Sequence, residues 1–307
     1  MDHVYDMVVI GGGPAGYTTA LYACRAGLDT LVLERMSVGG QMALTDVIDN
    51  YPGYDEGVDG FTLGMRMQAG AERFGARTEY AEVLRVELAG EIKRILTSDG
   101  ERWARTVVIA TGANPRPLGL HGEENLVGRG LHYCAHCDGR FYKDKVVAVL
   151  GGGNSAVSDA LYLSGLAKKV YLIHRRDRLR ATAIYEKPLM RAENVEILWN
   201  HAASEWVLAD GKLSGIVLEN TENGERRHLG VDGLFVSIGR LPATDLFAGQ
   251  VDLDAHGYVI ADESTRTNLE GVYAVGDVRT KLLRQVVTAV GDGAVAAYMA
   301  EEYLQTK

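Results

Sequence analysis

The sequence predicts an α/β protein with two domains built on parallel sheets, the second inserted into the first. Two observations predict this fold. A glycine-rich turn between two apolar runs occurs twice, at Gly11 and again at Gly151, and an apolar strand that suits the first sheet follows only near the end of the chain. A length of 307 residues suits about two domains.

Composition narrows the class of protein. The chain is 47% hydrophobic and 24% charged, as soluble globular proteins are, and its 37 glycines gather in turns. A formal net charge of −9 without basic runs argues against binding to nucleic acid or to an anionic membrane. The N-terminus lacks the pattern of a signal peptide, and no apolar run approaches the roughly 18 residues that cross a bilayer. We therefore expect a cytoplasmic protein.

The two turns belong to an internal duplication. Residues 8–35 read VVIGGGPAGYTTALYACRAGLDTLVLER, and residues 148–175 read AVLGGGNSAVSDALYLSGLAKKVYLIHR. Each copy has an apolar run, glycines, a helical periodicity and a second apolar run, which predicts a strand, turn, helix and strand. The pattern indicates two Rossmann-like nucleotide-binding domains.

The glycines at these turns have distinct mechanical roles. In each copy the first allows the tight turn, the next lets a pyrophosphate approach the backbone, and the last small residue lets the helix pack on the strand. The positions are Gly11, Gly13 and Gly16 in the first copy, and Gly151, Gly153 and Ala156 in the second. Pro14 fits the first helical turn, whose free N–H groups attract phosphate. The alternative is an ordinary strand-to-helix turn without a ligand. This alternative is stronger for the second copy, because Ala156 stands there in place of the third glycine.

The end of the second strand separates the two ligands. Glu34 ends that strand in the first copy, where a carboxylate accepts hydrogen bonds from a ribose and repels a 2′-phosphate, so FAD or NAD is expected there. The same register in the second copy holds His174, followed by three arginines, Arg175, Arg176 and Arg180. Guanidinium groups suit a 2′-phosphate, which favours NADPH over NADH. The alternative is a solvated basic patch.

Further pieces suit the first nucleotide. Residues 105–113 read as a buried strand ending in Thr-Gly-Ala, and residues 271–278 as a strand ending in Gly276-Asp277. Asp277 then lies where open α/β sheets bind ligands and would hold the ribityl chain or a hydroxyl near the phosphate. The alternative role, a helix N-cap, is compatible with this. Residues 283–304 read as an amphipathic helix. Because these pieces lie far from the first turn in sequence, we expect FAD-binding parts at 1–115 and 245–307, and an inserted NADPH domain at 116–244. Two crossings between the domains would form a double hinge.

A Cys-x-x-Cys pair, Cys134 and Cys137, lies between the two turns. The only other cysteine is Cys24, for which a core thiol is expected, so no second pair completes a zinc site. In a reducing compartment such a pair is more often catalytic or metal-binding than structural. Asp138 could supply protons to the dithiol or merely cap the following turn. His136 could favour the thiolate if protonated, or face solvent with little effect.

These motifs, in the order GGGPAG, GGQ…T…NYPG, ATGA, CAHCDG, GGGNSA, HRRDRLRA, GVYAVGDV and RQV, resemble the low-molecular-weight, bacterial-type thioredoxin reductases over essentially the whole chain. The resemblance implies a homodimeric FAD enzyme that passes electrons from NADPH to the disulfide of thioredoxin. It implies that Cys137 lies against the flavin as a thiolate, that Cys134 attacks thioredoxin, and that Asp138 is the acid and base. It places thioredoxin contact at Arg129.

The resemblance also implies two sets of cofactor residues. For FAD they are Gly11, Gly13, Pro14, Ala15, Gly16, Glu34, Gly40, Gln41, Asn50, Thr111, Gly112, Ala113, Gly276, Asp277, Arg284, Gln285 and Val286. For NADPH they are Gly153, Asn154, Ser155, Ala156, His174, Arg175, Arg176 and Arg180. No metal is expected.

The chain departs from the family pattern at two places. Ala-His stands between the cysteines where Ala-Thr or Ala-Val is commoner, and Ser158 replaces a glutamate expected near the nicotinamide. Three alternatives stay open: ferredoxin as the electron donor, against which the arginines argue; a glutaredoxin-like or peroxiredoxin-reducing protein as the acceptor; and a redox-sensing flavoprotein without fast turnover.

Overall fold

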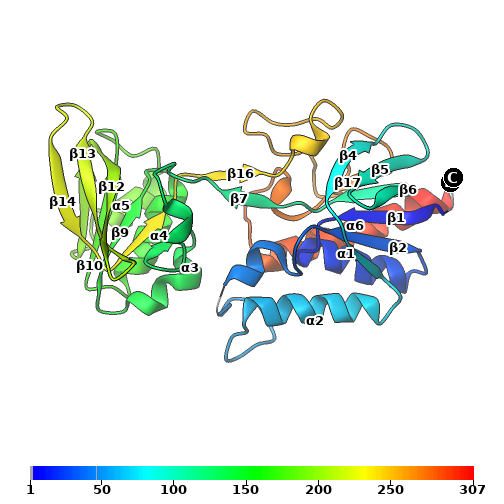
Figure 1. The fold of residues 1–307 in the computed structure, drawn as a ribbon, viewed down its shortest axis with the longest axis horizontal. Coiled ribbons are helices and arrows are strands. Elements are labelled where there is room, and N and C mark those ends of the chain that lie inside the picture. Colours follow the sequence, from blue (N-terminus) through cyan, green and yellow to red (C-terminus); the bar gives the residue numbers. More distant parts are fainter. Residues whose placement is uncertain (1–2, 46) are drawn as a thin grey trace. The chain divides into compact units, whose positions relative to one another are not determined.

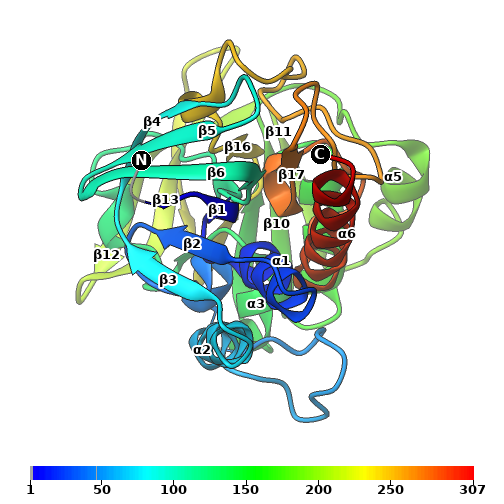
Figure 2. The same ribbon diagram turned by 90° about the vertical axis from the view of Figure 1, so that its right-hand side faces the viewer.

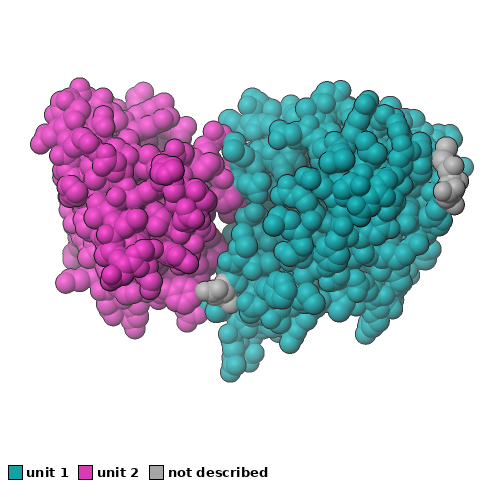
Figure 3. Space-filling view, viewed as in Figure 1, with its two compact units in different colours: residues 1–114, 241–307 teal, residues 115–240 magenta. Residues whose placement is uncertain are grey.

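The computed structural model describes residues 3–45 and 47–307. The chain forms two compact units, unit 1 from residues 1–114 with 241–307 and unit 2 from residues 115–240 (Figure 3). Two short strands, β7 (Ala113–Pro115) and β16 (Arg240–Pro242), pair with each other where the chain passes between the units.

Unit 1 is built on a seven-stranded sheet in the order β3-β2-β1-β6-β5-β4, with β17 also pairing with β6. Strands β1, β2, β3, β6 and β17 run parallel, and β4 and β5 extend the sheet antiparallel from β6. The strands are β1 (Tyr5–Ile10), β2 (Thr30–Glu34), β3 (Arg77–Tyr80), β4 (Val83–Glu87), β5 (Lys93–Thr97), β6 (Gly100–Ile109) and β17 (Val272–Ala274).

The helices of unit 1 are α1 (Pro14–Arg25), α2 (Gly60–Glu72) and α6 (Val286–Gln305), with short 3-10 turns η1 (Gly40–Leu44), η4 (Asp245–Phe247) and η5 (Gly276–Val278). Helices α1 and α6 pack side by side (Figures 1 and 2). Small residues allow this approach, because a side-chain carbon at Gly293 would meet the Ala15 carbonyl oxygen at 2.4 Å. The first and last helices of the chain therefore share one core.

Unit 2 carries a second parallel sheet in the order β11-β10-β9-β15-β8. A separate antiparallel sheet, β12-β13-β14, comes between β11 and β15 along the chain. Its strands are β8 (Leu131–His132), β9 (Val146–Leu150), β10 (Lys169–His174), β11 (Val195–Trp199), β12 (His201–Ala209), β13 (Lys212–Asn220), β14 (Arg226–Gly230) and β15 (Gly233–Val236). Its helical segments are η2 (Glu123–Asn125), α3 (Ala135–Asp138), η3 (Gly139–Tyr142), α4 (Asn154–Ser164) and α5 (Ala183–Leu189).

The predicted fold class is confirmed, with both strand–turn–helix–strand units at the expected residues. Some limits differ for local reasons. The helix expected from residue 283 begins at Val286, because Gln285 and Thr288 form a capping box there. The strand expected over 271–278 is only Val272–Ala274, since Gly276 adopts φ 73° and turns the chain into η5.

Candidate functional site

The first glycine turn has the shape that a bound pyrophosphate requires. A side-chain carbon at Gly11 would meet the Ala110 carbonyl oxygen at 2.4 Å, and one at Gly16 would meet the Gly11 carbonyl oxygen at 2.0 Å. At Gly13, the residue that precedes α1, nothing lies within 4 Å. Crowded outer glycines therefore flank an open one at the N-terminus of α1, whose free N–H groups attract phosphate.

Glu34 is fixed at the end of β2 by the same turn. Its carboxylate accepts hydrogen bonds from the Gly12 N–H, at 2.8 Å, and from the Met36 N–H, at 3.0 Å. The side chain is only partly buried, so the carboxylate can still accept hydrogen bonds from ribose hydroxyl groups. This geometry suits the adenosine ribose of a dinucleotide without a 2′-phosphate.

Segments far apart in sequence converge on this turn. A side-chain carbon at Gly40 would lie 3.5 Å from the Gly13 Cα, which places the start of η1 against the open glycine. The Asn50 amide donates to the Gln285 side-chain oxygen at 3.0 Å, across 235 positions of sequence. The structure thus brings together loop and helix residues that the sequence analysis assigned to one nucleotide.

The Thr-Gly-Ala segment after β6 lies beside Ala243, where the chain has re-entered unit 1. The Thr111 hydroxyl donates to the Ala243 carbonyl at 2.7 Å, and the Ala243 N–H donates to the Gly112 carbonyl at 3.0 Å. Ala113 is buried, whereas its neighbour Asn114 accepts a 2.9 Å hydrogen bond from the Gln41 amide. Sequence reasoning missed Asn114, because one polar residue after a strand carries no distinguishing pattern.

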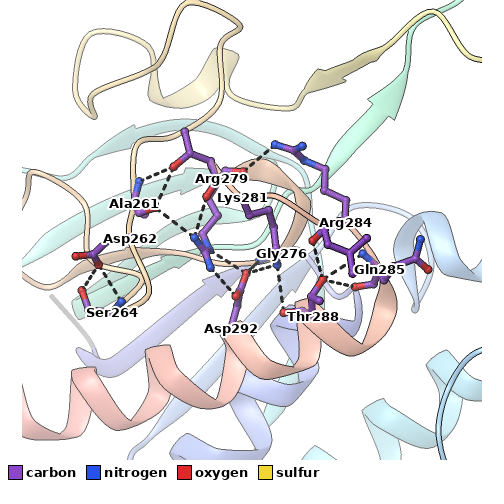
Figure 4. Close-up of polar contacts among 12 residues, drawn as sticks. Ala261, Asp262, Ser264, Gly276, Arg279, Lys281, Arg284, Gln285, Thr288 and Asp292 are labelled. Atoms are coloured by element: carbon purple, nitrogen blue, oxygen red, sulfur yellow. Dashed lines mark hydrogen bonds and ion pairs between the residues drawn. The ribbon is translucent and has the colours of Figure 1, made fainter. Parts of the chain in front are cut away.

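Asp292 of α6 organises the turn that carries Asp277 (Figure 4). Its carboxylate accepts hydrogen bonds from the Gly276 N–H at 2.9 Å, from two Arg279 nitrogens at 2.9 and 2.8 Å, and from Lys281 Nζ at 2.7 Å. The three charged side chains are at most 10% exposed. Burial raises the pKa of Asp292, but the bonds from Arg279 and Lys281 outweigh it and hold that pKa below its ordinary value. We call Asp292, Arg279 and Lys281 the buried charge cluster.

The buried charge cluster was not predicted from the sequence, because a lone aspartate in a helix has no distinguishing spacing. Arg284, which the sequence analysis did single out, serves the same turn. Its guanidinium donates to the carbonyls of Asp277 and Arg279 at 3.3 and 3.1 Å and lies 3.9 Å from the centre of the Tyr258 ring. Val286, the first residue of α6, packs on an apolar group that includes Met42.

The second turn repeats this geometry in unit 2. A side-chain carbon at Gly151 would meet the Ser237 carbonyl oxygen at 2.4 Å, whereas nothing lies within 4 Å of one at Gly153. Asn154 and Ser155 are exposed at the start of α4, and Ala156 is buried against the strand. The Asn154 side chain also accepts a 2.8 Å hydrogen bond from the Thr182 N–H. This turn therefore has the same open central glycine.

His174 occupies the place that Glu34 holds in the first copy. It is 5% exposed and packs over Gly152, where an added side-chain carbon would lie 2.2 Å from the imidazole. Its Nε2 pairs with the Arg178 carbonyl at 2.9 Å. Burial lowers the pKa of His174, and the nearby arginines lower it further, so the neutral ring is favoured.

The three predicted arginines, Arg175, Arg176 and Arg180, are all exposed and follow β10 directly. The Arg180 N–H donates to the Gly152 carbonyl at 2.7 Å, which fastens this basic loop to the glycine turn. Exposed guanidinium groups beside an open helix N-terminus suit a nucleotide with an additional phosphate.

The redox candidates lie in the same unit as the second turn. Cys134 and Cys137 form a disulfide with an S–S length of 2.00 Å and a Cα–Cα distance of 5.3 Å, around the single turn of α3. Asp138 follows, and its N–H donates to the Cys134 carbonyl at 3.1 Å. Its carboxylate lies 3.1 Å from His132 Nδ1, a neighbour that the sequence analysis missed because it precedes the motif.

His136 projects from α3 with its side chain 45% exposed. Its ring stacks on Tyr162 at a centroid distance of 4.3 Å, and its Nδ1 lies 3.7 Å from Asp159 Oδ1. The Ser237 hydroxyl donates to the other oxygen of Asp159. A protonated His136 would thus face a carboxylate, which offsets its charge.

The remaining candidates are placed simply. Arg129 is exposed, with its backbone tied to Leu126 and Leu213. Ser158 lies partly buried on α4. Cys24 is a half-buried free thiol whose pKa is raised by burial. Within residues 3–45 and 47–307, no cluster of three or more His, Cys, Asp or Glu side chains could hold a metal.

The helices in the described part of the chain include none with both the length and the apolar character to cross a membrane.

The residues around the two glycine turns fit two dinucleotides. Each turn has crowded glycines around an open one at a helix N-terminus, with an acidic group in one copy and basic groups in the other. The residues present therefore suit both groups.

Comparison with known proteins agrees with this geometry. Residues 5–293 match the family described as pyridine nucleotide-disulphide oxidoreductase. The thioredoxin reductase of Listeria innocua is 44% identical over 305 residues, which cover 99% of this chain and 95% of that protein. That of Bacillus subtilis is 41% identical over 304 residues, covering 99% and 96%. The crystal structure of thioredoxin reductase from Streptococcus pyogenes superposes with a TM-score of 0.87 at 42% identity, covering 100% of both chains.

Proposed function

Because the chain belongs to the pyridine nucleotide-disulphide oxidoreductase family, a membership that implies a flavin and a pyridine nucleotide, we propose that it is an NADPH-dependent thioredoxin-disulfide reductase with FAD as its flavin. The observation that carries the proposal is the Cys134–Cys137 disulfide, held in the same compact unit as the second dinucleotide turn. Full-length similarity to bacterial thioredoxin reductases supports thioredoxin as the acceptor.

The first turn is the proposed FAD site. The Glu34 carboxylate would accept bonds from the ribose, and the open Gly13 would admit the pyrophosphate. Asp277 lies at the carboxyl end of β17, where a ribityl hydroxyl could be bound. When bound, the flavin supplies a two-electron relay between the nicotinamide and the disulfide.

The second turn is the proposed NADPH site. We assign the 2′-phosphate to the exposed Arg175, Arg176 and Arg180 rather than to His174, whose buried ring is neutral and packed on Gly152. In this assignment His174 packs against the glycine turn, and the three arginines determine the specificity for NADPH. The bidentate geometry of guanidinium groups supports a preference for NADPH over NADH.

The dithiol reaction needs two electrons and two protons. Reduction breaks the Cys134–Cys137 bond and leaves two thiols, and we assign one proton transfer to Asp138. The Cys134 thiol then loses its proton and attacks one sulfur of the thioredoxin disulfide, which forms a mixed disulfide and releases the other thioredoxin sulfur as a thiolate that takes a proton. The Cys137 thiol loses its proton and attacks Cys134 Sγ, which re-forms the Cys134–Cys137 bond and releases the second thioredoxin sulfur as a thiolate that takes a proton. The two cysteines end oxidised and thioredoxin ends reduced.

The exposed Arg129 is the proposed contact with thioredoxin. We also propose that the protein is a homodimer and that it is cytoplasmic.

Rapid mixing of the FAD-loaded protein with NADPH or NADH, and then with oxidised thioredoxin, tests the proposal. We expect flavin bleaching with NADPH, followed by stoichiometric appearance of thioredoxin thiols. A triple Arg175→Ser, Arg176→Ser, Arg180→Ser variant should raise KM for NADPH about tenfold or more and leave KM for NADH nearly unchanged, because charge-assisted bonds to the phosphate are lost.

The matched control is Arg178→Ser, an exposed arginine of the same loop whose contact with His174 is made by its backbone. It should leave both KM values near those of the wild type. Bleaching without thioredoxin reduction would contradict the assigned acceptor, and an equal rate with NADH would contradict the assigned donor.

A further inference from the structure

His132 lies beside the proposed acid of the dithiol. It ends β8, two positions before Cys134, and its Nδ1 is 3.1 Å from Asp138 Oδ2. The His132 side chain is 8% exposed and that of Asp138 is 21% exposed, so the pair is largely shielded from water. A close contact of this kind between buried polar groups is strongly oriented, because few other partners are available to either group.

The other edge of the same ring is also occupied. His132 Nε2 lies 2.7 Å from the Tyr142 hydroxyl, and Phe235 stacks on the imidazole at a centroid distance of 5.2 Å. The Tyr142 ring meets it edge-on at 5.3 Å. The imidazole is therefore held in one orientation by two aromatic rings and two polar contacts.

The contact with Tyr142 favours one tautomer of the imidazole. Burial, and then the negative charge of Asp138, raises the pKa of Tyr142 to about 12, so its hydroxyl stays protonated at neutral pH. Tyr142 can then donate to Nε2, and in that tautomer Nδ1 carries the ring N–H. Nδ1 lies 3.1 Å from Asp138 Oδ2, so tyrosine, histidine and aspartate form a continuous row of polar contacts.

We propose that His132 is a positioning residue for Asp138: it binds one carboxylate oxygen, leaves the other for the dithiol, and stabilises the carboxylate once its proton has gone to sulfur. The inference rests on the proposed function, in which Asp138 exchanges protons with the dithiol. The proton balance is unchanged, because Asp138 gives one proton to a cysteine sulfur and the His132 N–H remains on nitrogen as a donor to the new anion.

A double-mutant cycle tests this coupling in the FAD-loaded protein. The variants are His132→Phe, Asp138→Asn and the two combined. Each variant is reduced with dithiothreitol, and the dithiothreitol is then removed. Iodoacetamide is added at pH 7, and mass spectrometry measures the rate at which the two cysteines are alkylated. In His132→Phe the carboxylate loses its donor, its charge disfavours the neighbouring thiolate, and alkylation should slow about threefold or more.

In the Asp138→Asn background the same His132→Phe change should have no effect, since no carboxylate remains. His132→Asn places an amide N–H near the position of Nδ1 and should restore alkylation to within about twofold of the wild type, whereas His132→Gln, whose amide reaches toward Tyr142, should not. The Asn and Gln variants carry the test on their own if His132→Phe does not fold.

Equal slowing by His132→Phe in both backgrounds, or equal rates for His132→Asn and His132→Gln, would overturn the inference. The alkylation readout needs neither a nucleotide donor nor thioredoxin. A wild-type protein that fails to reduce thioredoxin therefore counts against the proposed function alone, while loss of coupling counts against the positioning role alone.

Discussion

Replacing Asp292 with asparagine removes the only anion of the buried charge cluster while keeping nearly the same volume. The structure gives Asp292 four hydrogen bonds of 2.7–2.9 Å, three of them from Arg279 and Lys281. The variant leaves those two cations buried without a counter-charge, a change that costs about 3–5 kcal/mol in comparable pairs. We therefore expect the free energy of unfolding of unit 1 to fall by about 4 kcal/mol.

Differential scanning calorimetry measures this loss. For a domain of this size 1 kcal/mol corresponds to about 2–4 °C, so the transition of unit 1 should move down by about 8–16 °C. Because asparagine has one acceptor oxygen in place of two, the Gly276 N–H competes with Arg279 and Lys281 for it, and FAD titrated into the apoprotein should bind more weakly. Lys281→Met should cost less than Asp292→Asn, since the two-bond contact between Arg279 and Asp292 survives.

The control is Glu302→Gln, the same chemical change at an exposed site of the same helix. It should stay within about 0.5 kcal/mol of the wild type. A shift below about 2 °C for Asp292→Asn, or one no larger than that of Glu302→Gln, would refute the claim that the buried charge cluster holds this turn.

Three further predictions concern the two turns and the dithiol. Glu34→Gln should raise the Kd for FAD about tenfold in a fluorescence titration, because a charged acceptor for the Gly12 N–H and the ribose is lost; an unchanged Kd would contradict the ribose assignment. His136→Thr should shift the dithiol potential by less than about 15 mV against a glutathione series, since Asp159 offsets any charge on the imidazole; a shift of 30 mV or more would show that His136 tunes it. Burial lowers the pKa of His174 in the folded state, so its stabilising contribution is complete above about pH 6.5 and is lost as pH falls through the folded value; His174→Gln should flatten the decline in melting temperature between pH 7 and 5, and parallel curves would contradict this.

Local pattern was enough to predict the duplicated units. Gly11, Glu34 and His174 follow from the distance between a glycine turn and the end of the next strand, which the strand–helix–strand geometry keeps nearly constant. Asn50 and Gln285 were assigned to one cofactor only through family resemblance, and their hydrogen bond was not predicted, because a contact across 235 positions has no local signature.

The missed residues share another physical reason. His132 and Asp292 act through partners that only the tertiary fold brings to them: Asp138 and Tyr142 for His132, and the turn after β17 for Asp292. Neither has a spacing that repeats or a neighbour of the same kind. A lone histidine before a motif, or a lone aspartate in a helix, has many structural roles, and the choice among them depends on the packing around it.

The packing of α6 against α1 sets an order for biosynthesis. The ribosome makes α1 well before α6, so unit 1 lacks one wall of its core until residues 286–305 emerge. Residues 115–240 are contiguous and complete well before that point, so they can fold, and their cysteines can be oxidised, while unit 1 is unfinished. Capture of flavin at the proposed site is therefore a late event in maturation, and a chain that stalls before α6 would carry the dithiol without a flavin to reduce it.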